Sequence, residues 1–480
     1  MDYEVSSRAP TPPLHASPGS ATPGPWLAML AVMLAVWAMI VETTIINVAI
    51  PTIMRHFSMT QDSAQWLSTG FLGGMSATIL LAPWMDRSFG QRRVYIAALS
   101  LFVVSSMLGG FANSTALLIL ARTLQGAIAG LIQPLALVSV YRAFPVADRG
   151  KAMAVYGLGV VLAPALGPAL GGYLVTLFSW RAIFFVSVPV CLISIWLSSV
   201  YLPKDESPEP RSPFDWLGFV LLSLSLASLL VGFVVGHREG WLSLNFLVRL
   251  AVTLCLAGSF VLIEAKLDHP LINLQLLRNK RFVATTLVAF AYGLGQFGST
   301  YLIPLYVQSV AHYDAGKSGV LLIPAGIALA LSITMGGRLP DYFPTSRLMI
   351  VGLGLLVISF LLLATTGKDT SFFTMAAFVV IGHFGLGLTV PAMTIGALKV
   401  VPSDQFVQAA GAISFFRQVG GAIGVNALSI FLDWMSAREA QFEHTVGTAQ
   451  AAPFSNSFFA LSVIFLLAIY PAWRSGRSNA

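Results

Sequence analysis

Charged residues are scarce in this 480-residue chain: Asp, Glu, Lys and Arg make up only 10% of it, against about 25% in soluble domains. Hydrophobic residues make up 56%. The two cysteines, Cys191 and Cys255, both lie in apolar stretches, so neither a disulfide framework nor a cysteine metal site is predicted. No cluster of His, Cys and acidic residues suggests a catalytic centre, and we expect no enzyme activity. The composition excludes a string of soluble domains and predicts a polytopic membrane protein.

Long apolar stretches recur along the chain. A membrane-spanning helix needs about 20 mostly apolar residues, and helices are expected because open sheets cannot pair their backbone groups in lipid. We therefore predict an all-α membrane protein with fourteen transmembrane helices. The predicted spans are 26–50, 62–84, 93–112, 115–140, 152–176, 182–202, 214–236, 244–265, 282–308, 317–335, 347–366, 372–398, 407–433 and 455–473.

Lys and Arg are unevenly distributed between the two sides of the predicted membrane. Eighteen of the 27 fall on the side that holds both termini, seven fall on the other side, and Arg122 and Arg417 fall within spans. The positive-inside rule therefore predicts cytoplasmic termini. The first residues are rich in Pro, Ser, Ala and Thr, and we interpret them as a disordered tail rather than a cleavable signal sequence. The net charge of +7 is scattered over short loops, which does not indicate nucleic-acid binding.

Two loops resemble each other at corresponding places, 82–93 and 337–347. Each has an acid just past an apolar helix, Asp86 or Asp341, followed by an aromatic residue, a turn residue and arginine. Such weak internal symmetry is typical of transporter halves, although chance resemblance of two basic turns is the alternative. The predicted organisation is a tail at 1–25, a six-helix half at 26–203, an inserted helix pair at 204–266, an amphipathic link at 267–281, a second six-helix half at 282–473 and a tail at 474–480.

A single acid, Glu42, interrupts the first apolar stretch. An acidic residue at the centre of a membrane helix costs about 2.5–3.5 kcal/mol on insertion scales, so a retained one indicates an ion, a proton or a charged partner. Thr43, Thr44 and Asn47 share its helix and suggest a wet cavity. The alternative is an acid near a helix end that is solvated or structurally paired. We favour a functional carboxylate, which burial would bias towards its neutral form.

The fourth and fifth stretches carry further polar or conformational signals. Arg122, Gln125 and Gln133 fall on one helical face, which predicts a polar interior stripe. Structural pairing of Arg122 and a part in proton traffic are both open. The fifth stretch, 157–172, is rich in glycine and contains Pro164 and Pro168, so it favours a bend or a seal between halves over ordinary small-residue packing.

Other polar residues within the spans are weaker candidates. His383 is interpreted mainly as a neutral histidine bonded to backbone, with titration near neutral pH as the alternative. Arg417 is interpreted as a structural anchor near the cytoplasmic end of its helix. Gln296 and Tyr301 are candidates for the lining of a substrate cavity, although most aromatic residues of these helices are expected to pack against lipid.

Together these motifs resemble the major facilitator superfamily, and within it the fourteen-span drug:proton antiporters of the EmrB/QacA type. The resemblance rests on the acid–Thr–Ile–Ile–Asn–Val–Ala–Ile–Pro run of the first span, on 122–130, on 167–172, on 179–189 and on 269–282. Two departures stand out. The acid is Glu42 where the family mostly has Asp, and the loop after the second span carries one residue too many between Asp86 and Gly90.

The resemblance implies export of drugs or other amphipathic small molecules by alternating access in the cytoplasmic (inner) membrane, with Glu42 as the proton-coupling residue. The proton gradient would supply the energy, with no other cofactor. Some members work with a periplasmic adaptor and an outer-membrane channel. A dedicated transporter of one metabolite and a non-transporting receptor or scaffold are the alternatives. The implied gating and structural residues are Asp86, Arg87, Gly90, Arg92, Arg93, Gly167, Pro168, Gly171, Gly172, Asp341 and Arg417.

Overall fold

A computed structural model describes residues 24–145, 148–203, 213–267, 270–402, 405–442 and 451–477. In these segments every regular element is a helix, as the composition predicts. The predicted tail at 1–25 and the segment 204–212 lie almost wholly outside the described residues. The helices are α1 (Pro25–Phe57), α2 (Gln61–Ala64), α3 (Trp66–Thr78), α4 (Ala82–Phe89), α5 (Gln91–Gly110), α6 (Thr115–Ala143), α7 (Arg149–Leu177), α8 (Ala182–Phe185), α9 (Ser187–Tyr201), α10 (Trp216–Glu239), α11 (Leu244–Glu264), η1 (Leu274–Arg278), α12 (Lys280–Ser309), α13 (Ala315–Arg338), η2 (Leu339–Asp341), α14 (Thr345–Ala364), α15 (Phe372–Leu398), α16 (Phe406–Phe442) and α17 (Ala452–Ser475).

All fourteen predicted stretches fall on helical segments, but they are not equally suited to crossing a membrane. Within the described residues, 12 helices are long and apolar enough. The second stretch is divided among α2, α3 and α4, and the 13 residues of α3 fall short of the length a crossing needs. In α7, which runs for 29 residues, the described residues give only the short apolar segment Leu166–Leu177. The all-helical prediction is therefore confirmed with twelve candidate spans, while the count of fourteen stays a prediction.

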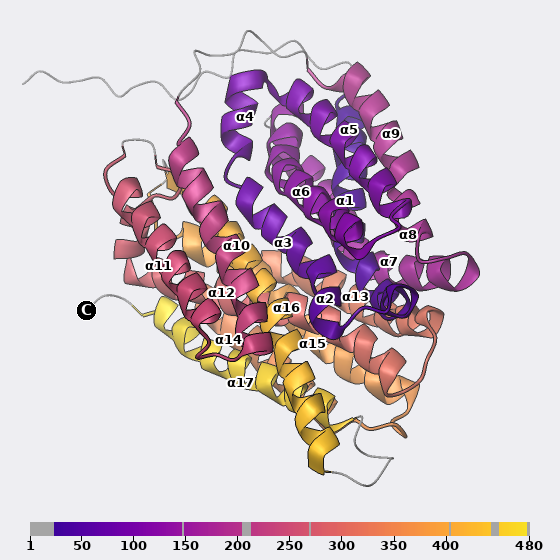
Figure 1. Ribbon diagram of the computed structural model, residues 1–480. Coiled ribbons are helices and arrows are strands. Elements are labelled where there is room, and N and C mark those ends of the chain that lie inside the picture. The colour runs from indigo at the N-terminus through magenta and orange to yellow at the C-terminus, as the bar shows by residue number, and fades with distance from the viewer. Residues whose placement is uncertain are drawn as a thin grey trace, which may run out of the picture.

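The helices form two groups with a hairpin beside them. In Figure 1, the indigo and purple helices of the first part of the chain gather in the upper right, and the orange and yellow helices gather below. Two contacts form the seam between the groups: α7 packs on α13, and α3 packs on α16. Within the first group, α7 also packs on α1, and α3 packs on α6. The α10–α11 hairpin lies at the side of this seam, where α10 contacts both α3 and α16. The hairpin, which lies between the two groups in sequence, thus touches helices from both.

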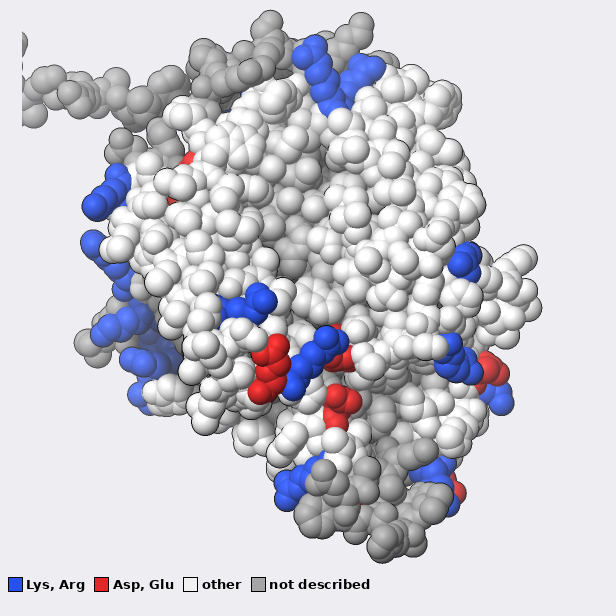
Figure 2. Space-filling view, viewed as in Figure 1, with Lys and Arg blue, Asp and Glu red and all other residues white. Residues whose placement is uncertain are grey.

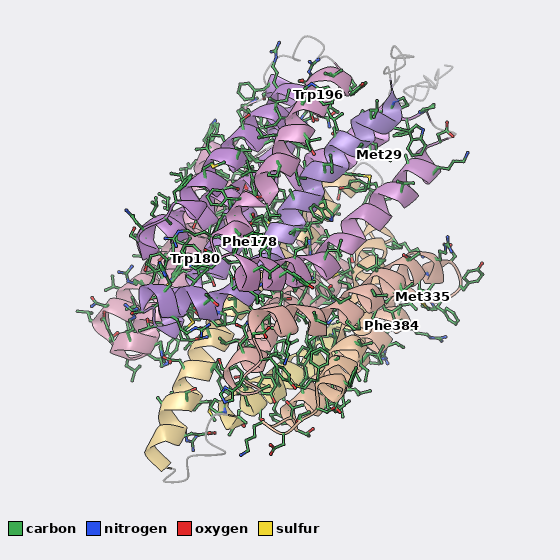
Figure 3. The ribbon with its side chains drawn as sticks, turned by 90° about the vertical axis from the view of Figure 1, so that its right-hand side faces the viewer. Met29, Phe178, Trp180, Trp196, Met335 and Phe384 are labelled. Carbon is green, nitrogen blue, oxygen red and sulfur yellow. The ribbon has the colours of Figure 1, made fainter. Side chains whose placement is uncertain are left out.

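Apolar side chains cover most of the outer surface. Figure 2 shows a face whose upper and middle part is almost free of charge, while Lys, Arg, Asp and Glu lie at its edges and across its lower part. Leu101, Phe178 and Leu262 are at least 60% exposed, and only 11% of the most apolar window of α11 is buried. Side chains radiate outwards all along the helices in Figure 3, where Met29 and Trp196 lie towards one end of the first group and Phe178 and Trp180 towards the other. Such a surface is stable in hydrocarbon and not in water.

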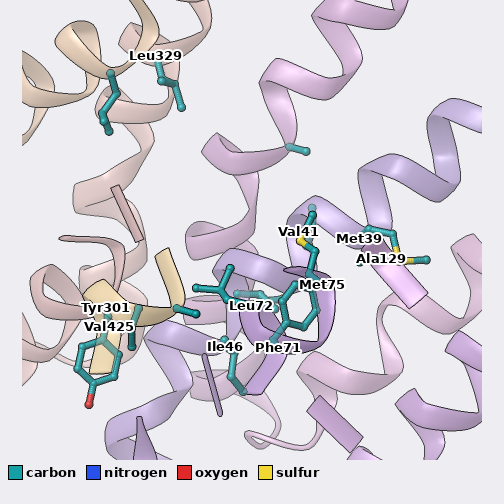
Figure 4. Packing of buried hydrophobic residues seen from close by; sticks show 14 of the residues in the cluster. Met39, Val41, Ile46, Phe71, Leu72, Met75, Ala129, Tyr301, Leu329 and Val425 are labelled. Atoms are coloured by element: carbon teal, nitrogen blue, oxygen red, sulfur yellow. The ribbon is translucent and has the colours of Figure 1, made fainter. Parts of the chain in front are cut away.

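Glycines let the inner helices approach closely. A Cβ at Gly126 on α6 would lie 1.9 Å from the carbonyl oxygen of Phe71 on α3, and a Cβ at Gly293 on α12 would lie 1.9 Å from that of Arg417 on α16. Small residues are the usual means of bringing membrane helices together, since lipid provides no hydrophobic drive between them. Figure 4 shows Phe71 packed beside neighbouring apolar side chains at the centre of the molecule.

Candidate functional site

The centre of the first half holds a fully buried acid–arginine pair. Glu42 on α1 and Arg122 on α6 both have 0% of their side-chain surface exposed, and Nη1 of Arg122 lies 3.3 Å from Oε2 of Glu42. Glu42 stands in mid-helix, between turns that are themselves buried. The structure therefore identifies the charge partner of Glu42, and it excludes a solvated acid at a helix end.

Arg122 is held by more than the carboxylate. Its Nε donates to the carbonyl oxygen of Leu67 at 3.0 Å, and its Nη2 donates to the carbonyl oxygen of Glu42 itself at 3.1 Å. Nη1 also donates to Oε1 of Gln125 at 2.9 Å, and the guanidinium carbon lies 4.5 Å from the centre of the Phe71 ring. Three of its four hydrogen-bond acceptors are uncharged oxygens. Most of the contacts that hold Arg122 therefore do not depend on the charge of Glu42.

Two serines, Ser187 and Ser106, complete the network, and no pattern in the sequence singles out either one. Ser187, in the first turn of α9, donates from Oγ to Oε1 of Glu42 at 2.8 Å. Gln125 donates from Nε2 to Oγ of Ser106 on α5 at 2.9 Å. Isolated serines are common in membrane helices and show no spacing that would single them out. Only the packing of α1, α5, α6 and α9 around one point reveals these contacts.

A second polar cluster lies one turn further along α1. Ser68 on α3 donates to Oδ1 of Asn47 at 2.7 Å. A small cavity of about 10 Å³, room for roughly one water molecule, lies beside them. Nearby, Gln65 just before α3 and Thr69 on α3 are fully buried, yet the Gln65 amide and the Thr69 hydroxyl have no hydrogen-bond partner. The cavity is lined by Thr43, Asn47, Ser68, Phe71, Leu72, Arg122, Phe297 and Val425.

A larger cavity of about 840 Å³ opens where both groups of helices end. Its walls include Arg55 on α1, His312 just after α12, and Asp433 on α16. Direct contacts join the two groups beside it. Nε2 of Gln61 donates to the Tyr301 hydroxyl at 2.6 Å, and Nε2 of Gln308 donates to the carbonyl oxygen of Val48 at 3.0 Å. Tyr301, predicted as a cavity residue, thus serves as a bridge between the groups.

The last turn of α10 contacts an acid from each half. Arg238 donates from Nε to Asp62 on α2, while Nε2 of His237 lies 2.8 Å from Oδ2 of Asp433 on α16. Asp62 lies before α3, outside the candidate spans. Burial by itself would raise the pKa of Asp62, but hydrogen bonds from Arg238 and Thr60 and the positive charge of Arg238 outweigh it, so this pKa lies below its ordinary value.

The glycine-rich stretch of α7 packs between α1 and the second half. A Cβ at Gly167 would lie 2.1 Å from Oγ1 of Thr44, and one at Gly171 would lie 2.7 Å from Cγ1 of Ile45. On the opposite side, a Cβ at Gly172 would lie 2.3 Å from the carbonyl oxygen of Ala315. The carbonyl oxygen of Pro168 lies 2.4 Å from the Cβ position of Gly319 on α13. The stretch therefore leaves no space for larger side chains between the halves.

The predicted loop residues are spread over several environments. Gly90 separates α4 from α5 with φ 86°, a backbone conformation that favours glycine. Arg92 donates to the carbonyl oxygen of Ser199, within the first half, and Nε of Arg87 donates to the carbonyl oxygen of Pro83 at 3.3 Å. Asp341 is exposed. Asp86 and Arg93 both have interaction partners in the structure.

The remaining candidates lie away from the central pair. Nδ1 of His383 donates to the carbonyl oxygen of Val379 at 3.0 Å, the backbone bond that the sequence favoured. Gln296 has a buried Oε1 without a partner, which suits a polar cavity lining, while Gln133 is half-buried on α6. Arg417 is half-buried on α16. Among the residues that the structure describes, no three His, Cys, Asp or Glu side chains lie close enough together to hold a metal ion.

A bundle of apolar helices around a buried carboxylate and arginine is typical of membrane transporters. The chain belongs to the Major Facilitator Superfamily, whose family model matches residues 32–425. It is 32% identical over 441 residues to the multidrug export protein EmrB of Haemophilus influenzae, covering 90% of this chain and 85% of the relative. It is 30% identical over 417 residues to a multidrug resistance protein B homolog of Mycobacterium tuberculosis, covering 84% and 74%.

Solved structures agree on the fold. A bacterial homolog of the human lysosomal transporter Spinster, in an inward-facing and occupied conformation, superimposes with a TM-score of 0.67 at 15% identity, covering 96% of this chain and 100% of the other. The POT family transporter PepTSo gives a TM-score of 0.68 at 15% identity, covering 94% of this chain and 99% of the other. At such low identity the likeness concerns the fold alone.

Proposed function

We propose that this protein exports drugs or other amphipathic small molecules across the cytoplasmic membrane in exchange for protons. The substrate class is supported by relatives that are named multidrug export or resistance proteins and that match most of the chain. The proton is supported by Glu42, the acid that is fully buried against Arg122 in the centre of the first half. That pair is the observation on which the proposal chiefly rests.

The contacts of the pair suit repeated protonation. Because uncharged oxygens of Leu67, Glu42 and Gln125 also hold Arg122, the guanidinium stays in place when the carboxylate is neutralised. Ser187 has a hydroxyl that can donate to a charged Glu42 and accept from a neutral one. Glu42 can thus bind and release a proton without leaving Arg122 or Ser187 short of a hydrogen-bond partner. Protonation changes the charge of Glu42, which is a residue of α1, and α1 contacts both α7 and α12.

Coupling then follows from the position of α1 between the halves. Loss of the Glu42 proton restores the attraction to Arg122, and protonation weakens it, so the two states favour different packing of α1 against α7 and α12. Substrate would bind from the cytoplasmic side to the deprotonated protein and leave after protonation from outside. The unpartnered polar groups of Gln65 at the N-cap of α3, Thr69 on α3 and Gln296 on α12 are proposed to contact the substrate between the halves.

The finer topology is part of this proposal. We propose that α3 with α4, and α7, are the two further crossings that complete fourteen, with both termini in the cytoplasm. The charge distribution between the loops supports that orientation. A periplasmic adaptor and an outer-membrane channel remain proposed partners. The outer segment 436–456 is their candidate contact, and its central part, 443–450, lies outside the described residues.

Reconstituted vesicles test the proposal. Wild type, Glu42→Gln and Glu239→Gln are compared for dye transport driven by an imposed pH gradient; Glu239 is an exposed acid on α10 and serves as the matched control. We expect wild type and the control to transport cationic amphipathic dyes, and Glu42→Gln to lose gradient-driven transport at normal protein levels. Normal transport by Glu42→Gln would refute the role of this acid. Transport of one metabolite and of no dye would favour a dedicated transporter instead.

A further inference from the structure

Two acids meet at the end of the α10–α11 hairpin that lies nearest α4 (Figure 1). Asp215 is the N-cap of α10: its Oδ1 accepts from the backbone N–H of Gly218 at 2.8 Å. Glu264 is the last residue of α11, and its Oε1 accepts from the backbone N–H of Ile272 at 2.7 Å. Each carboxylate therefore uses one oxygen to fix a backbone segment, Asp215 the start of α10 and Glu264 the link towards α12.

The other oxygen of each acid is buried and has no donor. Oδ2 of Asp215 and Oε2 of Glu264 are both inaccessible to solvent and without a hydrogen-bond partner. Glu264 as a whole is only 2% exposed. An ionised carboxylate can only accept hydrogen bonds, so two such oxygens in one buried site are costly unless something positive lies between them.

The two free oxygens face the same small space. The point where Gly218 would carry a Cβ lies 1.9 Å from Oδ2 of Asp215 and 3.0 Å from Oε2 of Glu264. The absence of a side chain at Gly218 is what allows the acids to approach each other. A proton on one carboxyl would let it donate a hydrogen bond to the free oxygen of the other.

A cluster of three aromatic rings flanks this end of the hairpin. The ring of Phe214 lies 5.0 Å from that of Trp84 on α4 and 4.8 Å from that of Trp216, measured between ring centres. Trp84 and Trp216 are also in contact, at 5.3 Å. The rings join α4 of the first half to the start of α10. They lower the local dielectric, which raises the cost of two adjacent negative charges.

We propose that Asp215 and Glu264 bind one proton between them, forming a proton-binding site separate from Glu42. The proton satisfies both free oxygens at once and removes one of the two negative charges. It leaves Oδ1 of Asp215 and Oε1 of Glu264 to hold Gly218 and Ile272. Loss of the proton sets two negative charges against each other, which strains the attachment of the hairpin to the link at 270–279.

No cation in the described part of the chain replaces that proton. Asp215 is the charged side chain that acts on Glu264, and neither acid forms an ion pair with a described Lys or Arg. Arg211, Asp268 and His269 are near in sequence but lie outside the described residues. The charged groups on the neighbouring elements are Asp86 and Arg87 of α4, Lys266 after α11, Arg278 of η1 and Arg417 of α16.

Infrared pH-difference spectra of the purified full-length protein test this site, since a protonated carboxyl has its own carbonyl band. A Glu42→Gln background removes the central acid from the signal. Asp215→Asn and Glu264→Gln keep the helix cap and the acceptor for Ile272, while their amide N–H groups replace the shared proton. We expect each variant to lack one protonated-carboxyl band at neutral pH, and the control Glu239→Gln to retain it.

Three outcomes would overturn the proposal. The first is a band that persists in either variant. The second is a band that disappears from the control as well. The third is loss of the wild-type band on addition of Na⁺, Mg²⁺ or Ca²⁺ with a rise in Tm that the variants lack, which would identify a metal-cation site. Gly218→Ala keeps both acids but places a Cβ between them, and should also lose the band.

Discussion

Truncating Arg122 should expose how strongly the central pair is coupled. Arg122→Met keeps the length and apolar stem of the side chain but leaves Glu42 buried without its cation. Breaking a buried pair from one side costs about 3–5 kcal/mol. Glu42→Gln costs less, about 1.5–3 kcal/mol for one charged hydrogen bond, because the amide still contacts Ser187 and Arg122 keeps its uncharged acceptors.

The double variant distinguishes this explanation from simple loss of packing. When both charges are removed, no unpaired ion remains, so Glu42→Gln with Arg122→Met should be more stable than Arg122→Met alone. The coupling free energy is measured by thermal or denaturant unfolding of wild type, the two single variants and the double variant in the same detergent. We expect about 1–3 kcal/mol, within the range measured for residues in contact. Costs that add to within about 0.5 kcal/mol would refute the reasoning.

Two further predictions concern the seam between the halves. Asp62→Asn should lower stability at pH 7 by at most about 1 kcal/mol, because its partner Arg238 is 56% exposed. The pKa of Asp62 is lowered in the folded protein, so this stabilisation is present above the ordinary aspartate pKa of about 4 and is lost as pH falls through the folded pKa. A difference in Tm between wild type and Asp62→Asn that survives in strong acid would contradict this assignment. Gly319→Ala should destabilise the protein and slow transport, because its Cβ would lie 2.4 Å from the carbonyl oxygen of Pro168, whereas the control Gly354→Ala has open space and should gain up to about 1 kcal/mol from helix propensity. Equal Tm values for the two alanine variants would refute a steric clash between the Cβ at position 319 and Pro168.

Composition and apolar periodicity determined the class and most of the fold. Each of the fourteen apolar stretches is helical, because in lipid a segment must pair its backbone groups within itself. The breaks in the second stretch differ in how far the sequence explains them. Residues 79–81 separate α3 from α4 just before Pro83, which lies at the start of α4 and has no N–H to donate to the carbonyl oxygen of Ile79. No comparable local breaker marks Gln65, which separates α2 from α3.

The site was predictable in part, and for a physical reason. A charge in an apolar helix is costly wherever it lies, so Glu42 and Arg122 stand out from sequence alone. Serine and glutamine carry no such cost, since they can bond to their own helix or simply pack. Ser187 and Gln65 therefore became candidates only through their burial and contacts.

The sequence by itself determined that the chain is a helical membrane protein with an anomalous acid in its first span. Only the tertiary structure decided which groups meet that acid. It joined Glu42 to Arg122, 80 positions away, and to Ser187, 145 positions away. It also brought together Asp215, at the start of α10, and Glu264, at the end of α11. Hydrophobic pattern acts along the chain and is readable there, whereas the pairing of buried charges depends on which helix faces touch.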